Sequence, residues 1–339
     1  MTMTGVLSAP SIDFAPSKLI VPASTENVTW TAGTTALFLP HAVPPDASGT
    51  WGQTLSVPNI CKNITDRSVY NDPTYGYMMI ASGDANDVNP STDYDQTGLF
   101  TSTSLTSGWA DYLGVPLIPL NATIPSPDCG DVQASQFWHL GSREFLVLHI
   151  GNANPPLYLG GGPSDDTSLC MTLVHSDLSI TRLGSVITSA TFGDDVHGVY
   201  VGKLVPVGHD GLPHIFVTCT DIRGVFGIYN AVSLSGSIYG PYTAVSQSAL
   251  FKAGGVTYMC DAWIENSQYE IYYFTGGTAG ISLATTNNGI DINFRKRILA
   301  PSGTLFATPR DGSIIKVGST WYAFCGGGGV KGVGVYTGV

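Results

Sequence analysis

Apolar residues along this chain occur in short runs in which small or polar residues alternate with them, and turn-forming residues bound most runs. One pair of runs recurs after residue 65: an apolar run with an aromatic residue, then a run that ends in Ser or Thr with Asp, Asn or Gly. Such alternation predicts antiparallel β-strands joined by turns. The first runs occupy residues 75–80, 144–149, 214–218, 269–274 and 320–325, and the second runs occupy residues 98–105, 169–177, 226–233, 280–287 and 333–338.

The five copies of this pair lie roughly 50–70 residues apart, and a fixed period of this kind is typical of β repeats in ring or solenoid folds. Each copy has room for three or four short strands, as in a propeller blade. One blade cannot bury both of its faces, whereas blades stacked around an axis can. The pattern therefore predicts an all-β fold, a five-bladed β-propeller. A β-sandwich whose strands resemble one another by accident is the alternative.

The last copy is short of a strand, because the chain ends at Val339 directly after its second run. The run at residues 34–40 has strand character, and we expect it to pair into the final blade and close the ring. Closure in this way removes an exposed sheet edge. Residues 1–65 would then be an N-terminal arm plus a ring-closing strand, and residues 66–339 the propeller. We expect residues 1–27 to form a surface arm that serves assembly.

Only 12% of the 339 residues are charged and 41 are Gly, which excludes a coiled coil and a highly charged helical protein. The 25 acidic and 14 basic side chains give a formal charge of −11, so we expect no nucleic-acid partner. No apolar run reaches the length of a membrane-spanning helix, so we expect no membrane insertion.

The first residues lack the basic segment and the apolar core of a secretory signal. The composition nevertheless suits a protein exposed outside a cell, with few Lys and many Ser, Thr, Gly, Tyr and Trp residues. Release by lysis on the surface of a virus particle reconciles the two observations. We therefore expect a virion-surface location, other virion proteins as partners, and a symmetric homo-oligomer.

None of the six cysteines forms a Cys-x-x-Cys pair, which argues against a zinc knuckle. Cys61 and Cys129 lie in loop-like stretches, where a disulfide between them is one possibility. The other four lie inside apolar runs and are expected to be buried free thiols: Cys170, Cys219, Cys260 and Cys325.

In a propeller the innermost strand of each blade lines a central channel, and we expect its first residues to open onto the face that carries the ligand site. Polar residues recur at about the same phase of each copy. A ring of carboxylates around one axis is unfavourable unless it is solvated, paired or bound to metal. The candidate ligand-binding residues are Asp72, Gln136, Asp194, Asp195, His197, Asp261, Trp263 and Arg310.

Residues 269–274, together with the run at 280–290, resemble the blade signature of five-bladed glycoside hydrolases of families 43, 32 and 62. Asn71-Asp-Pro73 is similar to the motif of their first blade. The resemblance covers roughly residues 66–339, and it implies that Asp72 is a catalytic base or nucleophile. In an enzyme of this kind Asp195 or Asp261 would serve as acid and orienting residue, and Arg310 would hold a substrate oxygen.

Glycoside hydrolysis needs two carboxyl groups about 5–9 Å apart, one of them a proton donor. The resemblance implies that a Glu at the start of an inner strand is this donor. None of the four Glu residues has this place: Glu144 and Glu270 fall within second-strand runs, Glu26 in the arm, and Glu265 in the turn after an inner strand. The sequence therefore favours a non-catalytic relative.

Three functions follow from these observations. The main hypothesis is a non-catalytic propeller of a virion surface (tail, fibre or head decoration) that binds host glycans, because Tyr and Trp stack on sugar faces and Asp and Asn accept sugar hydroxyls. The first alternative is a glycoside hydrolase or depolymerase that uses channel carboxylates on a polysaccharide. The second is a purely structural assembly module.

We expect no cofactor and no metal site, with a Ca²⁺ ion at Asp194, Asp195, Asp261 and His197 as the alternative.

Overall fold

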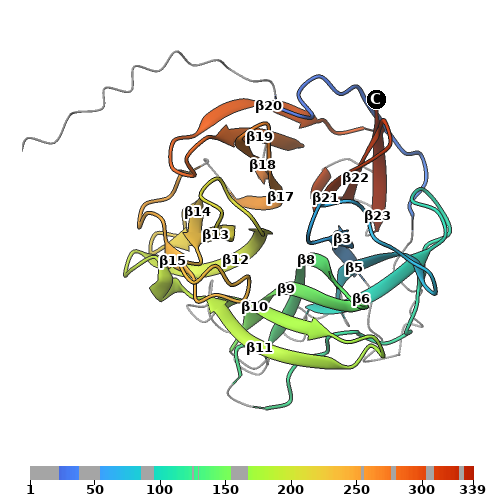
Figure 1. Ribbon diagram of the computed structural model, residues 1–339, viewed down its shortest axis with the longest axis horizontal. Helices are drawn as coiled ribbons and strands as arrows, with labels where there is room; N and C mark the ends of the chain where they lie inside the picture. The colour runs from blue at the N-terminus through green and yellow to red at the C-terminus, as the bar shows by residue number, and fades with distance from the viewer. Residues whose placement is uncertain are drawn as a thin grey trace, which may run out of the picture.

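The computed structural model shows five antiparallel sheets arranged as blades around one axis (Figure 1), which confirms the predicted five-bladed β-propeller. No helix in the described part of the chain is long and apolar enough to cross a membrane. The structure describes residues 23–37, 54–84, 95–123, 126–128, 130–153, 167–252, 256–275, 280–302, 309–327 and 332–339.

The first two blades follow one another along the chain, and one short strand bridges them. Blade 1 contains β2 (Thr54–Ile60), β5 (Gly76–Asp84), β6 (Asp95–Ser102) and β7 (Ala110–Asp111), with β4 (Asn71–Asp72) paired to β5. Blade 2 contains β8 (Asp131–Gly141), β9 (Glu144–Asn152), β10 (Thr167–Val174) and β11 (Ile180–Ile187), with β3 (Lys62–Asn63) parallel to β8.

The remaining three blades complete the ring. Blade 3 contains β12 (Val196–Val205), β13 (His214–Asp221), β14 (Phe226–Val232), β15 (Thr243–Ala244) and β16 (Phe251–Lys252), and a short 3-10 helix, η2 (Ser189–Thr191), precedes it. Blade 4 contains β17 (Thr257–Glu265), β18 (Gln268–Thr275), β19 (Ile281–Thr286) and β20 (Asn293–Leu299). Blade 5 contains β21 (Pro309–Val317), β22 (Thr320–Gly327), β23 (Val333–Gly338) and β1 (Trp30–Ala32).

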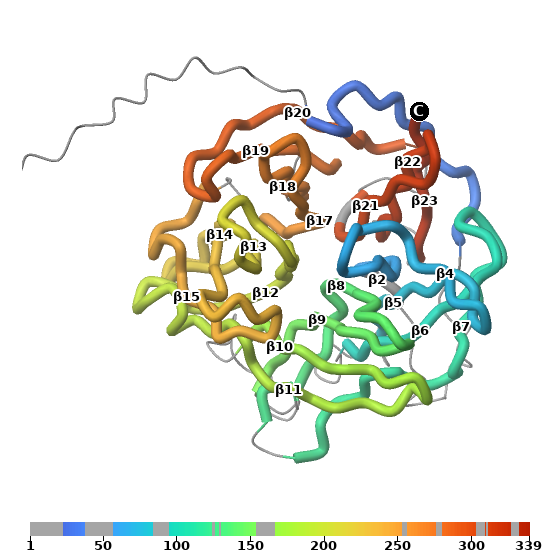
Figure 2. Tube along the Cα trace, in the orientation of Figure 1, coloured from blue at the N-terminus to red at the C-terminus, as the bar shows by residue number. Residues whose placement is uncertain are grey.

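The innermost strands are β2, β8, β12, β17 and β21, and each contacts the inner strands of the two neighbouring blades around the axis (Figure 2). Apolar side chains of neighbouring blades form five core clusters. For example, Trp138 of blade 2 and Val217 of blade 3 belong to one cluster, and Trp263 of blade 4 and Trp321 of blade 5 to another. The blades thus bury their faces against each other, as the repeat pattern predicts.

An N-terminal strand closes the ring, but it is not the run at residues 34–40. The pairing strand is β1, in which Trp30 lies opposite Gly338 of β23. It ends at Ala32, and at the following Gly33 a Cβ atom would approach the carbonyl oxygen of Val335 to 2.8 Å. The amides of Gly33 and Leu37 donate to the carbonyls of Val335 and Val333, and residues 38–40 lie outside the described residues.

Residues 23–27 do not form a surface arm, contrary to our expectation. Ala23 is 4% exposed and Thr25 is fully buried against blade 4. Ser24 donates both its backbone N–H and its hydroxyl to the carboxylate of Glu270, each over 2.6 Å. This segment therefore fastens blade 4 to the strand that completes blade 5. Residues 1–22 lie outside the described residues.

Blade 1 begins with β2, so its first strand precedes residue 66, where we expected the propeller to start. The pattern concealed this strand because Pro58 interrupts it and Val57 has a positive φ of 49°. The pairing register with β5 shifts between Ser56 and Asn59, as at a β-bulge.

The cysteines in apolar runs are buried free thiols, as predicted. Cys61 is also a buried free thiol, and Cys129 lies outside the described residues. The possible disulfide between these two residues thus lies partly outside the described residues, within which Cys61 is a free thiol.

Candidate ligand site at the propeller axis

The inner strands β12 and β17 end beside the same cavity, so we call that side of the propeller the strand-end face and the opposite side the strand-start face. Asp131, Val196 and Pro309 lie at the strand-start face. Gly141, Val205, Glu265 and Val317 lie at the strand-end face. We expected the ligand site at the strand-start face.

A buried ion pair crosses the axis. The ammonium of Lys62 lies 2.7 and 3.0 Å from the two carboxylate oxygens of Asp261, and neither side chain is more than 1% exposed. Asp261 also accepts the backbone N–H groups of Ile314 at 2.7 Å and of Ala262 at 3.0 Å. Both oxygens of Asp261 are therefore occupied by partners from three different parts of the chain.

A second lysine joins the other inner strands. Lys203 of β12 donates to the side chain of Asn59 in β2 at 2.8 Å, to the carbonyl of Ser135 in β8, and to that of Gly312 in β21 at 3.3 Å. Burial, with the neighbouring Lys62 opposing the attraction of Asp261, lowers the pKa of Lys203 to about 8. Burial also lowers the pKa of Lys62. We call Lys62, Asp261, Lys203 and Asn59 the axial hub.

Two of the predicted ligand residues belong to this packed axis. Asp261 is the acidic member of the hub, and Gln136 exchanges hydrogen bonds with the backbone of Leu204 in the neighbouring blade. Both side chains are at most 1% exposed. They are structural groups, because their side chains hydrogen-bond to other blades: Asp261 to Lys62 and Ile314, and Gln136 to Leu204.

Asp72 lies away from the inner strands, in β4 beside β5. Its carboxylate accepts the backbone N–H groups of Thr74 and Tyr75 and the hydroxyl of Tyr70, and it pairs with Arg143 at 3.1 Å. Burial opposes the shift, but these donors hold the pKa of Asp72 below its usual value. Asp72 therefore caps the turn that follows Asn71-Asp-Pro73, and its catalytic role stays a prediction.

The remaining candidates lie at the strand-start end. Asp194 and Asp195 are exposed in the turn before β12, and His197 is half-buried at the second position of that strand. Arg310 lies at the second position of β21, and its side chain is outside the described part. Trp263, near the end of β17, is at the opposite face. The structure thus does not bring the predicted residues together in one site.

No group of three or more His, Cys, Asp and Glu side chains that would suit a metal ion occurs among the described residues. Two of the four Glu residues lie where the sequence placed them relative to the strands. Glu144 and Glu270 belong to the second strands β9 and β18, and Glu265 is the last residue of β17. Glu26 precedes β1 and pairs with Arg295 at 2.5 Å. None of the four therefore stands at the start of an inner strand.

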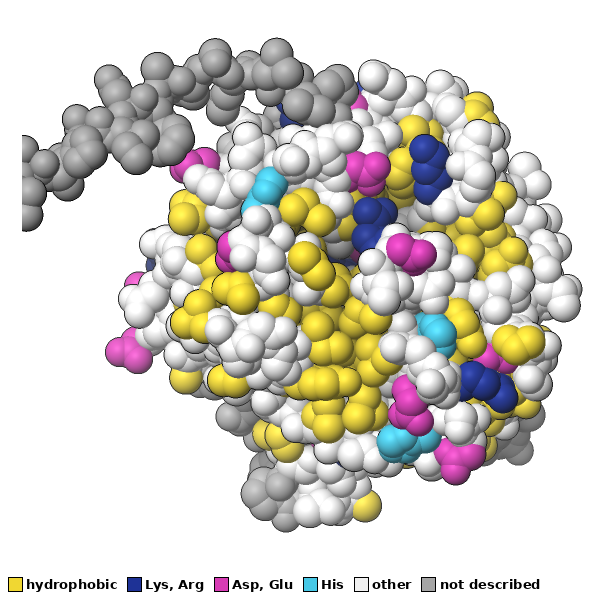
Figure 3. Space-filling model, viewed as in Figure 1, with side chains coloured by type: hydrophobic (Ala, Val, Ile, Leu, Met, Phe, Trp, Pro, Cys, Tyr) yellow, Lys and Arg dark blue, Asp and Glu magenta, His cyan; other side chains and the backbone are white. Residues whose placement is uncertain are grey.

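A cavity of about 280 Å³ opens at the strand-end face. Figure 3 shows hydrophobic side chains gathered near the middle of the molecule in this view, over the region of β12, with basic and acidic groups beside them. The cavity combines an apolar wall with a polar rim. Its lining consists of Ile64, Thr65, Asp66, Arg67, Val205, Pro206, Val207, Ala262, Trp263, Ile264 and Glu265.

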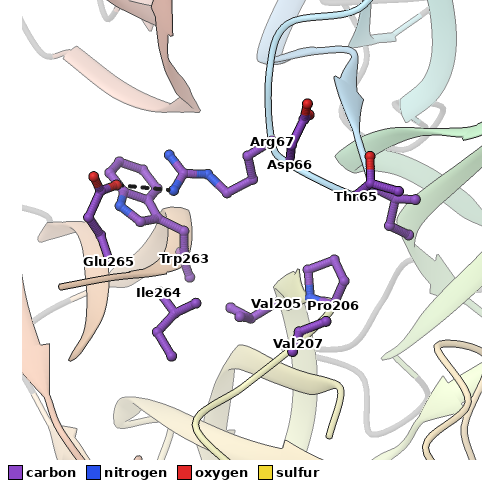
Figure 4. A pocket seen from close by; sticks show the side chains of 11 residues that line it. Thr65, Asp66, Arg67, Val205, Pro206, Val207, Trp263, Ile264 and Glu265 are labelled. Atoms are coloured by element: carbon purple, nitrogen blue, oxygen red, sulfur yellow. Dashed lines mark ion pairs between the residues drawn. The ribbon is translucent and has the colours of Figure 1, made fainter. Parts of the chain in front are cut away.

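We call this cavity the axial pocket. Arg67, Trp263 and Glu265 lie together at one end of it (Figure 4). The guanidinium carbon of Arg67 lies 4.2 Å from the centre of the Trp263 ring, and its nitrogen lies 3.6 Å from a carboxylate oxygen of Glu265. Tyr272 stacks with Trp263 at a centroid distance of 4.3 Å. The indole is fully buried, since Tyr272 and Arg67 both pack against it. Arg67 itself sits in a turn with a φ of 61°.

Sequence reasoning missed Lys62, Lys203 and Arg67. Two of them carried a usable signal, because Lys62 follows Asn-Ile-Cys and Lys203 interrupts the run Val-Tyr-Val-Gly-Lys-Leu-Val. A lysine inside an apolar strand is rare and is seldom fully buried unless paired. The position of Arg67 over Trp263 had no such signal, since it depends on closure of the ring.

No protein-family model and no curated protein matches the chain. Its fold is similar to that of a structure from the GH130 family of mannoside phosphorylases, which contains glycoside hydrolases that target β-1,2-mannosidic linkages in Candida mannan. That match has a TM-score of 0.67 at 11% identity and covers 94% of this chain and 95% of the other.

Two further structures show the same likeness. A family 117 glycoside hydrolase produced by the marine bacterium Zobellia galactanivorans matches with a TM-score of 0.63 at 12% identity, over 93% of this chain and 91% of the other. Inulosucrase from Halalkalicoccus jeotgali bound to kestose matches with a TM-score of 0.58 at 10% identity, over 89% and 82%. The chain is thus a five-bladed propeller with glycoside hydrolases among its structural neighbours, and identities this low show the fold alone.

Proposed function

We propose that this chain is a non-catalytic propeller that binds carbohydrate in the axial pocket. The observation that carries the first half of the proposal is the Lys62–Asp261 pair. Glycoside hydrolysis needs two carboxyl groups facing the same bond, whereas Asp261 is enclosed by a lysine and two backbone amides. Asp72, the second of the three expected catalytic residues, is held in a turn in β4, and the third, Asp195, lies at the strand-start face.

The second half of the proposal rests on the chemistry of the axial pocket. Ligand sites pair apolar walls with a few placed polar groups. Val205, Pro206 and Ile264 offer a wall for the C–H face of a sugar ring, while the carboxylates of Asp66 and Glu265 offer acceptors for hydroxyl groups. A cavity of about 280 Å³ has room for one or two sugar rings.

A glycan array followed by calorimetric titration tests this proposal. Val207 lines the pocket and is 60% exposed, so Val207→Trp fills the pocket without disturbing a core position. Val115→Trp is the matched control, because Val115 is 57% exposed and does not line the pocket. We expect at least a tenfold loss of affinity in the first variant only. Equal affinity in both variants would move the site elsewhere.

Glycoside hydrolysis is the second candidate function, and the structural neighbours favour it. The strand-start face carries Asp131 in β8, Asp195 before β12 and Asp311 in β21. Asp311 is 8% exposed and has a φ of 44° at a bulge, and such backbone strain is often found at functional sites. Release of reducing ends from a polysaccharide panel, abolished by Asp311→Asn, would replace the non-catalytic proposal with this one.

The expected place on a virus surface, the virion partners and the homo-oligomer stay predictions. Detection of the chain in purified particles by mass spectrometry would test the location, and light scattering would test the oligomer.

A further inference from the structure

We infer that the axial pocket selects carbohydrates that carry a free ammonium group, that is, amino sugars. This inference rests on the proposed carbohydrate binding and names the class of ligand. The guanidinium of Arg67 already occupies one face of the Trp263 ring. A guanidinium lies over the indole and beside a carboxylate, so this part of the pocket is built to hold a cation.

Arg67 is weakly held in that position. Its partner Glu265 is 42% exposed, and exposed ion pairs of this kind contribute little. The Nε atom of Arg67 is buried without a hydrogen-bond partner in the described structure. An incoming cation that brings its own hydrogen-bonding groups can therefore take the place of the guanidinium.

The charges around the pocket favour a cationic over an anionic ligand. Asp66 and Glu265 lie on its rim, and Arg67 is the single basic residue of the lining. Once Arg67 is displaced, the rim presents two carboxylates to the ligand. The whole chain has a formal charge of −11, which attracts a polycation and repels glycans that carry uronate or sulfate.

The apolar wall of the pocket favours an amino sugar over a simple amine as the ligand. Val205, Pro206 and Ile264 form an apolar wall beside the indole (Figure 4). An ammonium group attached to a pyranose ring would meet Trp263 and Glu265, while the C–H face of the ring would meet this wall. A small organic cation would leave the wall uncovered.

The experiment compares two forms of one oligosaccharide, glucosamine tetramers and their N-acetylated counterparts, by calorimetry at a pH where the amines are protonated. The wild type should bind the amine form at least about tenfold more tightly, because acetylation removes the charge. Glu265→Gln should remove most of this preference. Arg67→Ala should tighten binding of the amine form about fivefold, since it removes the internal competitor.

Arg143→Ala is the matched control. Arg143 also lies over an aromatic ring, 4.9 Å from the centre of Tyr75, and pairs with a carboxylate, but it is outside the axial pocket. Its substitution should leave the affinity unchanged. Equal affinity for both tetramers would overturn the inference and leave the proposed function intact. Weaker binding by Arg67→Ala would also overturn it, and binding of no glycan at all would overturn both.

Discussion

The ammonium of Lys62 lies 2.7 Å from a carboxylate oxygen of Asp261, although the two residues are 199 positions apart in the chain. They come from opposite sides of the ring, on β3 and β17. Carboxylates gathered in a polar channel at the axis of a propeller would repel one another. Here opposite charges meet, and the axis is packed with hydrogen bonds between blades.

Removing one partner of this pair should destabilise the fold strongly. Lys62→Met leaves the Asp261 carboxylate buried without its cation, which costs about 3–5 kcal/mol. The double variant Lys62→Met/Asp261→Asn should recover part of that loss, because the unpaired carboxylate is gone, while the buried Lys203 keeps Asn59 and the backbone carbonyls as acceptors. Urea unfolding measures both. Lys316→Met is the control, since Lys316 is exposed and lies over Trp321. A single variant as stable as the control would show that the pair is unimportant.

The buried Lys203 predicts a rise in stability with pH. Its pKa is about 8 in the folded chain against an ordinary value of 10.5, so between these values the unfolded state binds more protons. Stability therefore rises across this window, by on the order of 3 kcal/mol. Buried Tyr and Cys residues titrate in the same range with the opposite sign. The difference between wild type and Lys203→Met isolates the lysine, and a flat difference curve would contradict the prediction.

The blades were predictable from sequence because their paired strands are consecutive and well patterned. The runs at 269–274 and 280–287 became β18 and β19. The inner strand of blade 1 was not predicted, because Pro58 breaks its alternation of apolar and polar residues. The turn at Asn71-Asp-Pro73 was assigned the position of that strand in the repeat instead. The site escaped for another reason: Arg67 and Trp263 meet only when blades far apart in sequence become neighbours.

Glu270 should be essential for ring closure. Its carboxylate accepts the N–H and hydroxyl of Ser24 and the hydroxyl of Tyr272, and it is fully buried. Glu270→Ala leaves these donors without acceptors, and each buried group left unpaired costs about 1–3 kcal/mol. Glu144→Ala is the control, because Glu144 is also on a second strand but is 39% exposed. Thermal unfolding should separate the two variants clearly, and equal melting temperatures would contradict a role of Glu270 in ring closure.

Asp72 separates a structural from a catalytic interpretation of the chain. Asp72→Asn keeps an oxygen for the amides of Thr74 and Tyr75 but loses the charge that pairs with Arg143. We expect a loss of about 1–2 kcal/mol in unfolding free energy and no change in glycan affinity, because Asp72 does not line the axial pocket. Asp177→Asn is the control, since Asp177 also accepts a backbone amide, from Ser179, but in an exposed turn. If Asp72→Asn instead abolished release of reducing sugar and kept full stability, Asp72 would be a catalytic residue, and the similarity of Asn71-Asp-Pro73 to the hydrolase motif would reflect function.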